Sequence, residues 1–416
     1  MTETKYLIIG AGAASSWAIR GIRQADKEGA ITRVGNEPYR TYSLPLLSKG
    51  FIQGRYPEEK IYLVKEDFYE KNGVNFISTK TVTSLDTENN TAVLDDGQEI
   101  TYEKLLICTG GSALRFQIPG SDLRRIYYLR TMNDAKFIKN AAVSAKEAVV
   151  VGGSFIGVEL AAALREIGLN VKLIMLEDYV WQNLLPESVG MYLMDLLREN
   201  GVQIFPAQKA VEFTGDGTVA EALVTEDGSI FVGDLFGIGI GIRTNKDFLS
   251  GSGIETNRGI IVNDKLETNV SGVFAAGDVA EYPDTLIDET HLSGHIENAQ
   301  MQGRTAGKNM AGGDEKYSQI TGYDTEIFST SLMFIGAPEY GADYIIRYID
   351  GQPGVTLSHK EGKLCGALLI KPSGKDMRAV REMMSTEDLN ILDHQMELSD
   401  PGGDLFTFVK GLKESE

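Results

Sequence analysis

Short apolar runs that stop at glycines recur along the chain. The first run, residues 4–9, predicts a buried strand, because it is short and apolar and ends at Gly10. Residues 13–24 are rich in alanine and predict a helix, and residues 31–34 predict a second strand. This order of strand, glycine turn, helix and strand is typical of the opening unit of a dinucleotide-binding sheet.

The same order of elements returns in the middle of the chain. Residues 148–151 predict a strand, Gly152 and Gly153 a turn, residues 155–167 a helix and residues 171–176 the next strand. One supersecondary unit therefore occurs twice. Two copies predict two nucleotide-shaped sites in one chain.

Further strands and helices fill the rest of the sequence. The predicted strands are residues 75–77, 91–94, 105–108, 235–238, 273–276, 344–349 and 364–370, and the predicted helices are residues 296–310 and 374–384. Strands that alternate with helices in this way indicate an α/β protein.

Composition narrows the possible functions. The chain has 416 residues, of which 46 are glycine and 11 are proline, and its net charge is −19. That charge disfavours nucleic acids and anionic membrane surfaces as partners. The two cysteines, Cys108 and Cys365, give no CxxC motif, no zinc-ligand spacing and no disulfide framework. With neither a long apolar run nor a signal-peptide pattern, we expect a cytoplasmic protein.

The first glycine loop has the spacing that a pyrophosphate needs. In Gly10-Ala11-Gly12-Ala13-Ala14-Ser15, the first glycine permits the tight turn, the second lets the backbone approach the phosphates, and the small third position lets helix and strand pack closely. The expected cofactor contacts here are Gly10, Gly12, Ala14, Ser15, Asn36 and Glu37. Glu37 follows the second strand at a distance that suits a ribose hydroxyl; the alternative is an ordinary acidic residue in a turn.

The second loop repeats this spacing with one change. The expected contacts are Gly152, Gly153, Ser154, Phe155, Ile156 and Gly157, with Ser154 in place of the middle glycine. Its hydroxyl is small and is itself able to donate to a phosphate. Glu177 follows the next strand and is the candidate ribose ligand, unless it belongs to a solvated turn. A carboxylate there repels a 2′-phosphate and so favours NAD over NADP.

Both loops, together with four further segments, resemble the flavoprotein reductases that have two dinucleotide-binding domains. The further segments are residues 101–110, 236–243, 268–278 and 42–49. The last of these, Tyr42-Ser43-Leu44-Pro45-Leu46-Leu47-Ser48-Lys49, is similar to a segment of the ferredoxin-reductase, rubredoxin-reductase and apoptosis-inducing-factor branch.

The resemblance implies a glutathione-reductase-like α/β fold with two Rossmann-like domains. It places a split FAD domain at residues 1–115 and 243–316, an inserted NAD domain at 116–242, and an α+β interface domain at 317–416, with FAD and NAD(H) as cofactors. It implies that Asp278 holds the ribityl chain. Further cofactor contacts are expected at Val82, Thr109, Gly110, Arg130, Gly241, Glu297 and Asn298.

In this branch a lysine and a glutamate form a pair beside the flavin N5 atom, and Lys49 and Glu159 occupy those positions. We expect them to tune the flavin and to position the nicotinamide; the alternative is a plain salt bridge between domains. Since hydride transfer belongs to the cofactors, no acid, base or nucleophile is assigned.

Several positions depart from the branch. Leu44 replaces an arginine that contacts FAD, for which Arg40 is a possible substitute, and Ile296 replaces a tryptophan over the flavin. Phe328 is expected near the flavin, with core packing as the alternative. His291 and His295 are four positions apart, which fits one helix face, but no metal site is expected.

The resemblance predicts the route of the electrons as well. Disulfide reductases need a redox-active cysteine beside the flavin, whereas this chain has Ser43 and Ser48 in that region, and Cys108 is expected to be a buried inert thiol. We therefore expect an NADH-dependent FAD oxidoreductase that passes electrons to ferredoxin, rubredoxin or an iron–sulfur subunit. The alternatives are an NADH oxidase or other small-molecule reductase, and a redox-sensing or scaffold flavoprotein. A homodimer and a stable hetero-complex both remain open.

Overall fold

A computed structural model describes residues 2–415. The chain divides into two compact units, each made of three separate segments. Unit 1 comprises Met1–Ser43, Glu58–Ser112 and Ile242–Thr321, and unit 2 comprises Leu44–Pro57, Ala113–Gly241 and Gly322–Glu416. The finer three-domain boundaries expected above remain a prediction.

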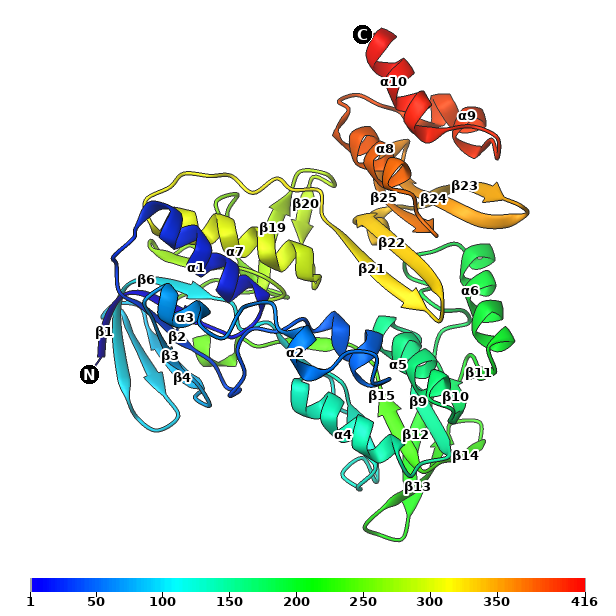
Figure 1. Ribbon diagram of the computed structural model, residues 1–416, viewed down its shortest axis with the longest axis horizontal. Coiled ribbons are helices and arrows are strands. Elements are labelled where there is room, and N and C mark those ends of the chain that lie inside the picture. The colour runs from blue at the N-terminus through cyan, green and yellow to red at the C-terminus, as the bar shows by residue number, and fades with distance from the viewer. Residues whose placement is uncertain (1, 416) are drawn as a thin grey trace. The chain divides into compact units, whose positions relative to one another are not determined.

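Unit 1 is built on a seven-stranded sheet with the order β3-β2-β1-β6-β5-β4, in which β18 also pairs with β6 (Figure 1). Strands β3, β2, β1, β6 and β18 run in parallel, whereas β4 and β5 form an antiparallel extension. The elements of this unit are β1 (Thr2–Ile9), α1 (Ala13–Ala25), β2 (Ile31–Val34), α2 (Glu58–Ile61), α3 (Phe68–Lys71), β3 (Val74–Ile77), β4 (Val82–Asp86), β5 (Thr91–Leu94), β6 (Glu99–Ile107), β7 (Gly111–Ala113), β16 (Ile242–Thr244), η2 (Asp247–Leu249), β17 (Ile260–Ile261), β18 (Val273–Ala275), β19 (Ala280–Asp284), β20 (Glu289–His291) and α7 (Ile296–Met310).

Two helices of unit 1, α1 and α7, lie side by side (Figure 1). Their close approach depends on glycine, because a Cβ at Gly303 or Gly307 would overlap the carbonyl of Ala14 or Ala18. Part of the glycine surplus therefore serves helix packing rather than cofactor binding.

Unit 2 contains a second parallel sheet, with the order β11-β10-β9-β15-β8, and a small antiparallel sheet, β12-β13-β14. Its C-terminal part is an antiparallel sheet of order β21-β22-β25-β24-β23. The elements are η1 (Leu47–Phe51), β8 (Ile126–Tyr128), α4 (Met132–Ala142), β9 (Glu147–Val151), α5 (Phe155–Glu166), β10 (Asn170–Ile174), α6 (Glu187–Glu199), β11 (Val202–Phe205), β12 (Ala210–Gly215), β13 (Ala220–Thr225), β14 (Ile230–Val232), β15 (Leu235–Ile238), β21 (Gly322–Ile327), β22 (Thr330–Gly336), η3 (Pro338–Tyr340), β23 (Asp343–Ile349), β24 (Gln352–Lys360), β25 (Lys363–Ile370), α8 (Gly374–Ser385), η4 (Ile391–His394), α9 (Gln395–Ser399) and α10 (Leu405–Ser415).

Local sequence explains where several helices begin. Thr131 and Ser373 cap α4 and α8, and in each case the side chain accepts a hydrogen bond from the third residue of the helix. Strands β9, β15 and β18 of the two parallel sheets are mainly apolar and buried, as expected for sheets covered on both faces. The predicted α/β class with two Rossmann-like parts is confirmed.

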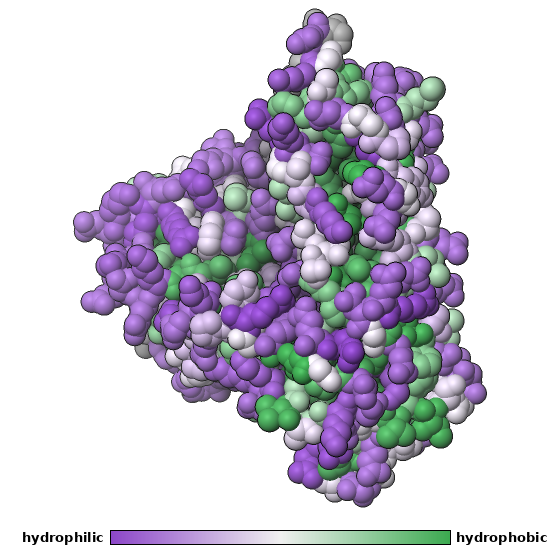
Figure 2. All heavy atoms as spheres, turned by 45° about the vertical axis from the view of Figure 1, so that its right-hand side comes forward, coloured by the Kyte–Doolittle hydropathy of each residue, from purple (hydrophilic) through white to green (hydrophobic). Residues whose placement is uncertain are grey.

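Hydrophilic residues cover most of the face that Figure 2 shows, and polar residues separate its apolar areas. In the part of the chain that the structure describes, no helix has the length and apolar character needed to span a membrane.

Candidate functional site

The first glycine loop, in unit 1, joins β1 to α1. Gly10 has φ +134°, and a Cβ there would overlap the carbonyl oxygen of Cys108, so the turn requires glycine. A Cβ built on Gly12, in contrast, has no neighbour within 4 Å. Backbone that is open at the N-terminus of a helix suits a pyrophosphate. The residues present therefore fit a dinucleotide.

Ala14 and Ser15 lie in the first turn of α1, and both side chains are buried. The Ser15 hydroxyl donates to the carbonyl oxygen of Gly12 at 2.7 Å, so it stabilises the loop itself. Contact of these two residues with the cofactor stays a prediction. Because both side chains are buried, such a contact would involve their backbone atoms.

The carboxyl ends of three neighbouring strands bring other predicted residues to this loop. Strand β6 lies between β1 and β18, with Ile107 opposite both Ile9 and Ala275. Because parallel strands end at one edge of a sheet, Gly110 and Asp278 come to the same edge as Gly10. Thr109 is at this edge too, and its hydroxyl donates to the carbonyl of Asn245 at 2.6 Å.

The other predicted contacts of unit 1 differ in exposure. Asn36 is exposed, and Glu37 accepts hydrogen bonds from the Tyr42 hydroxyl at 3.0 and 2.9 Å. Val82 is buried at the start of β4, so its side chain belongs to the core. The possible substitute Arg40 stacks over the ring of Tyr62 at 3.7 Å and pairs with Glu59.

Glu297 and Asn298 lie in the first turn of α7 but have different environments. Glu297 is half-buried, whereas Asn298 is fully buried. The Asn298 amide donates to the carbonyl of Ser293 at 3.2 Å and accepts from the Tyr317 hydroxyl at 2.7 Å. The side chain of Asn298 thus anchors the start of α7. Since this side chain is fully buried, it has no exposed surface with which to contact a cofactor.

The second glycine loop, in unit 2, joins β9 to α5. Gly152 has φ +119°, and a Cβ at Gly157 would overlap the Gly152 carbonyl. Phe155 and Ile156 form the first turn of α5, as expected. The expectation that the Ser154 hydroxyl is available to a phosphate needs correction, because this hydroxyl donates to the carbonyl of Gly239 at 2.6 Å.

Glu177 lies over the second loop. Its Oε2 atom is buried without a hydrogen-bond partner, and a Cβ at Gly153 would approach that atom to 2.9 Å. A buried carboxylate oxygen without a partner is costly and fits a ligand hydroxyl. This part of unit 2 therefore fits a nucleotide ribose.

Two further predicted contacts lie in unit 2. Gly241 has φ +109°, which favours glycine. Arg130 is half-buried and precedes Thr131, the cap of α4, and its backbone N–H donates to Asp134 at 3.1 Å. Contact of either residue with NAD(H) stays a prediction.

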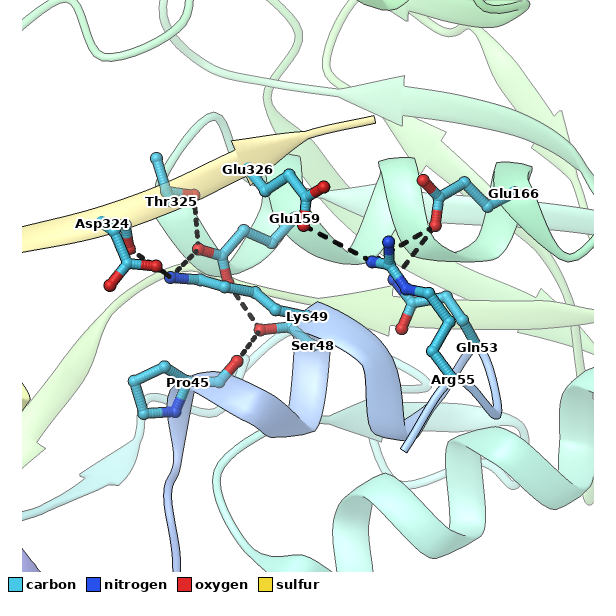
Figure 3. Close-up of polar contacts among 10 residues, drawn as sticks. All are labelled: Pro45, Ser48, Lys49, Gln53, Arg55, Glu159, Glu166, Asp324, Thr325 and Glu326. Carbon is cyan, nitrogen blue, oxygen red and sulfur yellow. Dashed lines mark hydrogen bonds and ion pairs between the residues drawn. The ribbon is translucent and has the colours of Figure 1, made fainter. Parts of the chain in front are cut away.

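The predicted pair of Lys49 and Glu159 is formed (Figure 3). Lys49 is the third residue of η1, and Glu159 lies on α5. The Lys49 Nζ atom is 3.7 Å from Oε1 of Glu159. Lys49 also pairs with the exposed carboxylate of Asp324 at 3.3 Å and donates to the backbone carbonyl of that residue. The position of this pair relative to a flavin stays a prediction.

Both carboxylate oxygens of Glu159 accept hydrogen bonds from hydroxyl groups. Ser48 donates to Oε2 at 2.5 Å and Thr325 to Oε1 at 2.6 Å. Burial raises the pKa of Glu159, and the neighbouring Lys49 charge and the two hydroxyl donors partly oppose that rise. The buried carboxyl group is thus held by two hydroxyl donors and one ion pair, and these partners come from two segments, η1 and β21.

A second, more exposed cluster lies beside this pair. Arg55 is 3.6 Å from the carboxylate of Glu166 and 3.7 Å from that of Glu326, as Figure 3 shows. Phe328, in the turn after β21, lines the same small cavity as Lys49 and Glu159. Its nearness to a flavin stays a prediction.

Neither cysteine is placed for redox chemistry. Cys108 and Cys365 are both buried and form no disulfide. Burial raises the pKa of the Cys108 thiol to about 12, so the reactive thiolate is scarce at neutral pH. The expectation of an inert thiol is supported.

The prediction that His291 and His295 share one helix face is wrong. His291 ends β20 and His295 precedes α7, so the two share no helix face. His291 is buried, and its Nδ1 atom lies 2.8 Å from the carboxylate of Asp284. The spacing of four residues was misleading because a strand, not a helix, contains the first of them.

Four residues that contact the first glycine loop or the Lys49–Glu159 pair were not predicted from the sequence. Asp324 and Thr325 gave no local signal, because they reach Glu159 only through the fold. Ser48 stands out in the sequence only because it is not a cysteine. Arg33 does have a sequence signal, because it is a charged residue in the strand at residues 31–34.

Two glycine loops at the ends of parallel strands, each fit for a dinucleotide, define a protein that binds two dinucleotides. Comparison with known proteins agrees. Residues 4–303 match the family described as "Pyridine nucleotide-disulphide oxidoreductase". The chain belongs to this family, and its cofactors are FAD and NAD(H).

Two curated relatives are similar over most of their length. The benzene 1,2-dioxygenase system ferredoxin–NAD(+) reductase subunit of Pseudomonas putida is 30% identical over 340 residues, which cover 82% of each protein. The NADH-rubredoxin oxidoreductase of Clostridium acetobutylicum is 32% identical, over 77% of this chain and 78% of the relative. In fold, the chain resembles the reductase of the covalent putidaredoxin reductase–putidaredoxin complex, with a TM-score of 0.93, 23% identity and full coverage of both chains.

Proposed function

We propose that this chain oxidises NADH and passes the electrons through FAD to a ferredoxin, a rubredoxin or an iron–sulfur subunit. The observation that carries the proposal is the burial of both cysteines, with a thiol pKa of about 12 at Cys108. Without a reactive thiol, electrons leave the flavin directly. Bound FAD supplies the chemistry, since it accepts a hydride and releases electrons one or two at a time.

The residues of the chain bind and orient the two cofactors. The first loop holds FAD with Asp278, and the second loop holds NADH with Glu177 on a ribose hydroxyl. Lys49, fixed by Glu159 and Asp324, supplies a positive charge whose position is set by two partners. These are the roles that the geometry of each unit supports.

A protein acceptor must overcome the net charge of −19, because many electron-transfer proteins are acidic themselves. Residues 113–146 are an exception to this overall charge, with seven basic residues against two acidic ones. We propose that this segment, which includes α4, offers an acidic acceptor its attractive surface. We also propose a cytoplasmic location, which the two buried, unbridged cysteines support.

Steady-state assays with the purified holoprotein test this function. We expect rapid NADH-dependent reduction of ferredoxin, measured through cytochrome c, and slow consumption of oxygen. Rapid oxygen consumption would instead indicate an NADH oxidase, and very slow turnover with every acceptor would indicate a redox-sensing protein. Purification from the native source shows whether the acceptor is a permanent subunit.

A further inference from the structure

Arg33 is a buried cation in unit 1 without an ionic partner. Its side chain on β2 is 0% exposed, and its guanidinium lies 4.8 Å from the ring centre of Tyr69 and 4.3 Å from that of Phe76. No carboxylate of residues 2–415 forms an ion pair with it, and its Nη1 atom has no hydrogen-bond partner. Burial lowers the pKa of Arg33, but a guanidinium stays charged inside proteins. A buried charge of this kind is unfavourable unless something else offsets it.

The hydrogen bonds of Arg33 lead to the first glycine loop. Its Nη2 group donates to the carbonyl of Ala11 at 2.6 Å, and its Nε group donates to the carbonyl of Gly10 at 3.3 Å. Thr41 donates to the same Ala11 carbonyl at 3.2 Å. Two consecutive peptide groups of the loop are therefore held from one side.

Peptide geometry determines where the other side of these groups points. In a trans peptide the C=O and N–H bonds point in opposite directions. With the carbonyls of Gly10 and Ala11 directed to Arg33, the N–H groups of Ala11 and Gly12 are directed away from it. No backbone acceptor within residues 2–415 binds either N–H group. The loop is also open at Gly12, where an added Cβ would have no neighbour within 4 Å.

We propose that Arg33 is a positioning residue for FAD. It holds the two peptides so that their N–H groups meet the pyrophosphate, and the negative charge of the pyrophosphate offsets the buried guanidinium across these polarised peptides. The apoprotein therefore carries a buried charge without an ion pair, and FAD binding stabilises that charge further. The proposal deepens the function above, since it rests on FAD occupying the first loop.

The test compares Arg33→Met and Arg33→Lys with the control Arg23→Met. Arg23 also donates to backbone carbonyls in unit 1, those of Asn72 and Asp26, but not to the loop. FAD is removed from each protein, its dissociation constant is measured by fluorescence quenching, and thermal unfolding is recorded with and without FAD.

We expect Arg33→Met to weaken FAD binding about tenfold or more while its apoprotein unfolds at the wild-type temperature or above, because the unpaired charge is gone. Arg33→Lys should retain charge but lose the paired hydrogen bonds, and so bind FAD with intermediate affinity. Arg23→Met should bind FAD as the wild type does.

Wild-type FAD affinity in a folded Arg33→Met protein overturns the proposal. An equal loss of stability with and without FAD also overturns it, because it would mean that Arg33 only packs the core. If Arg33→Met does not fold, Arg33→Lys decides by the same two readings. Failure of the wild-type apoprotein to bind FAD would instead refute the proposed function itself.

Discussion

Ser48 donates a 2.5 Å hydrogen bond to Glu159, although 111 positions separate the two residues in sequence. A hydroxyl has one proton to donate, and the Pro45 carbonyl, 3.3 Å from the same oxygen, is a second acceptor for it. Ser48 is thus able to donate to an ionised Glu159 or to accept from a protonated one while donating to Pro45. The site therefore accommodates both charge states of this carboxyl group without leaving a donor unpaired.

Replacing Lys49 with methionine should make stability depend more strongly on pH. Burial already raises the pKa of Glu159 above its ordinary value of 4.5, and Lys49 opposes this rise. A raised carboxyl pKa means that stability falls as pH increases from the unfolded pKa through the folded pKa. We expect Lys49→Met to lose little at pH 5 and about 3 kcal/mol at pH 8, measured by urea unfolding.

The control for this experiment is Arg55→Met. Arg55 forms two ion pairs in the adjacent cluster, but it is partly exposed. Its loss should cost less than about 1 kcal/mol at either pH. A loss of stability in Lys49→Met that is the same at pH 5 and pH 8 would contradict the assignment of Glu159 as its buried partner.

Removing either hydroxyl donor of Glu159 should destabilise the protein. Ser48→Ala and Thr325→Val each delete one short hydrogen bond to a buried carboxylate. We expect each to lower the free energy of unfolding by about 1–3 kcal/mol at pH 8, and by less at pH 5. Ser144→Ala, an exposed serine on the same unit, is the control and should change it by less than about 0.5 kcal/mol.

Glu177 should determine both the affinity for NADH and the preference over NADPH. Glu177→Ala removes the carboxylate whose Oε2 atom has no partner in the protein. We expect kcat/KM for NADH to fall about tenfold or more, with a smaller change for NADPH and unchanged FAD retention. Asp178→Ala, at the exposed neighbouring position, should behave as the wild type; an equal effect of both substitutions would exclude a specific ribose contact.

Alanine substitutions of Gly10 and Gly12 in the first loop should have different effects on stability and on FAD affinity. Gly10→Ala should destabilise even the apoprotein by more than about 2 kcal/mol, because of its φ of +134° and the overlap with Cys108. Gly12→Ala has room in the protein itself, so the apoprotein should remain stable while FAD affinity falls. Calorimetry of the apoproteins and FAD titration distinguish the two. Tight FAD binding by Gly12→Ala would show that the pyrophosphate lies elsewhere.

Neither thiol should take part in turnover. With a Cys108 pKa of about 12, Ellman's reagent should label neither cysteine of the native protein at pH 8, but both after unfolding in guanidinium. The double variant Cys108→Ala, Cys365→Ala should retain NADH-driven electron transfer. Loss of that activity in a folded double variant with bound FAD would reopen the disulfide-reductase interpretation.

Much of the fold was predictable because its signals are local. The strand before Gly10, the helix after it and the helix at residues 296–310 lie where the apolar pattern predicts them. Errors arose where spacing alone was used, as with His291 and His295, and where a side chain has a partner distant in sequence. Ser154 is of the second kind, because Gly239 takes its hydroxyl hydrogen bond.

The sequence by itself determined the two glycine loops and the charge pair of Lys49 and Glu159, since these follow from residue spacing and from a resemblance over short segments. Only the tertiary structure decided what surrounds them. It brought the hydroxyl groups of Thr325 and Ser48 within hydrogen-bond distance of Glu159, and the guanidinium of Arg33 within hydrogen-bond distance of the first loop. Hydrogen bonds between distant segments depend on how strands and helices pack, and no local pattern of residues records that packing.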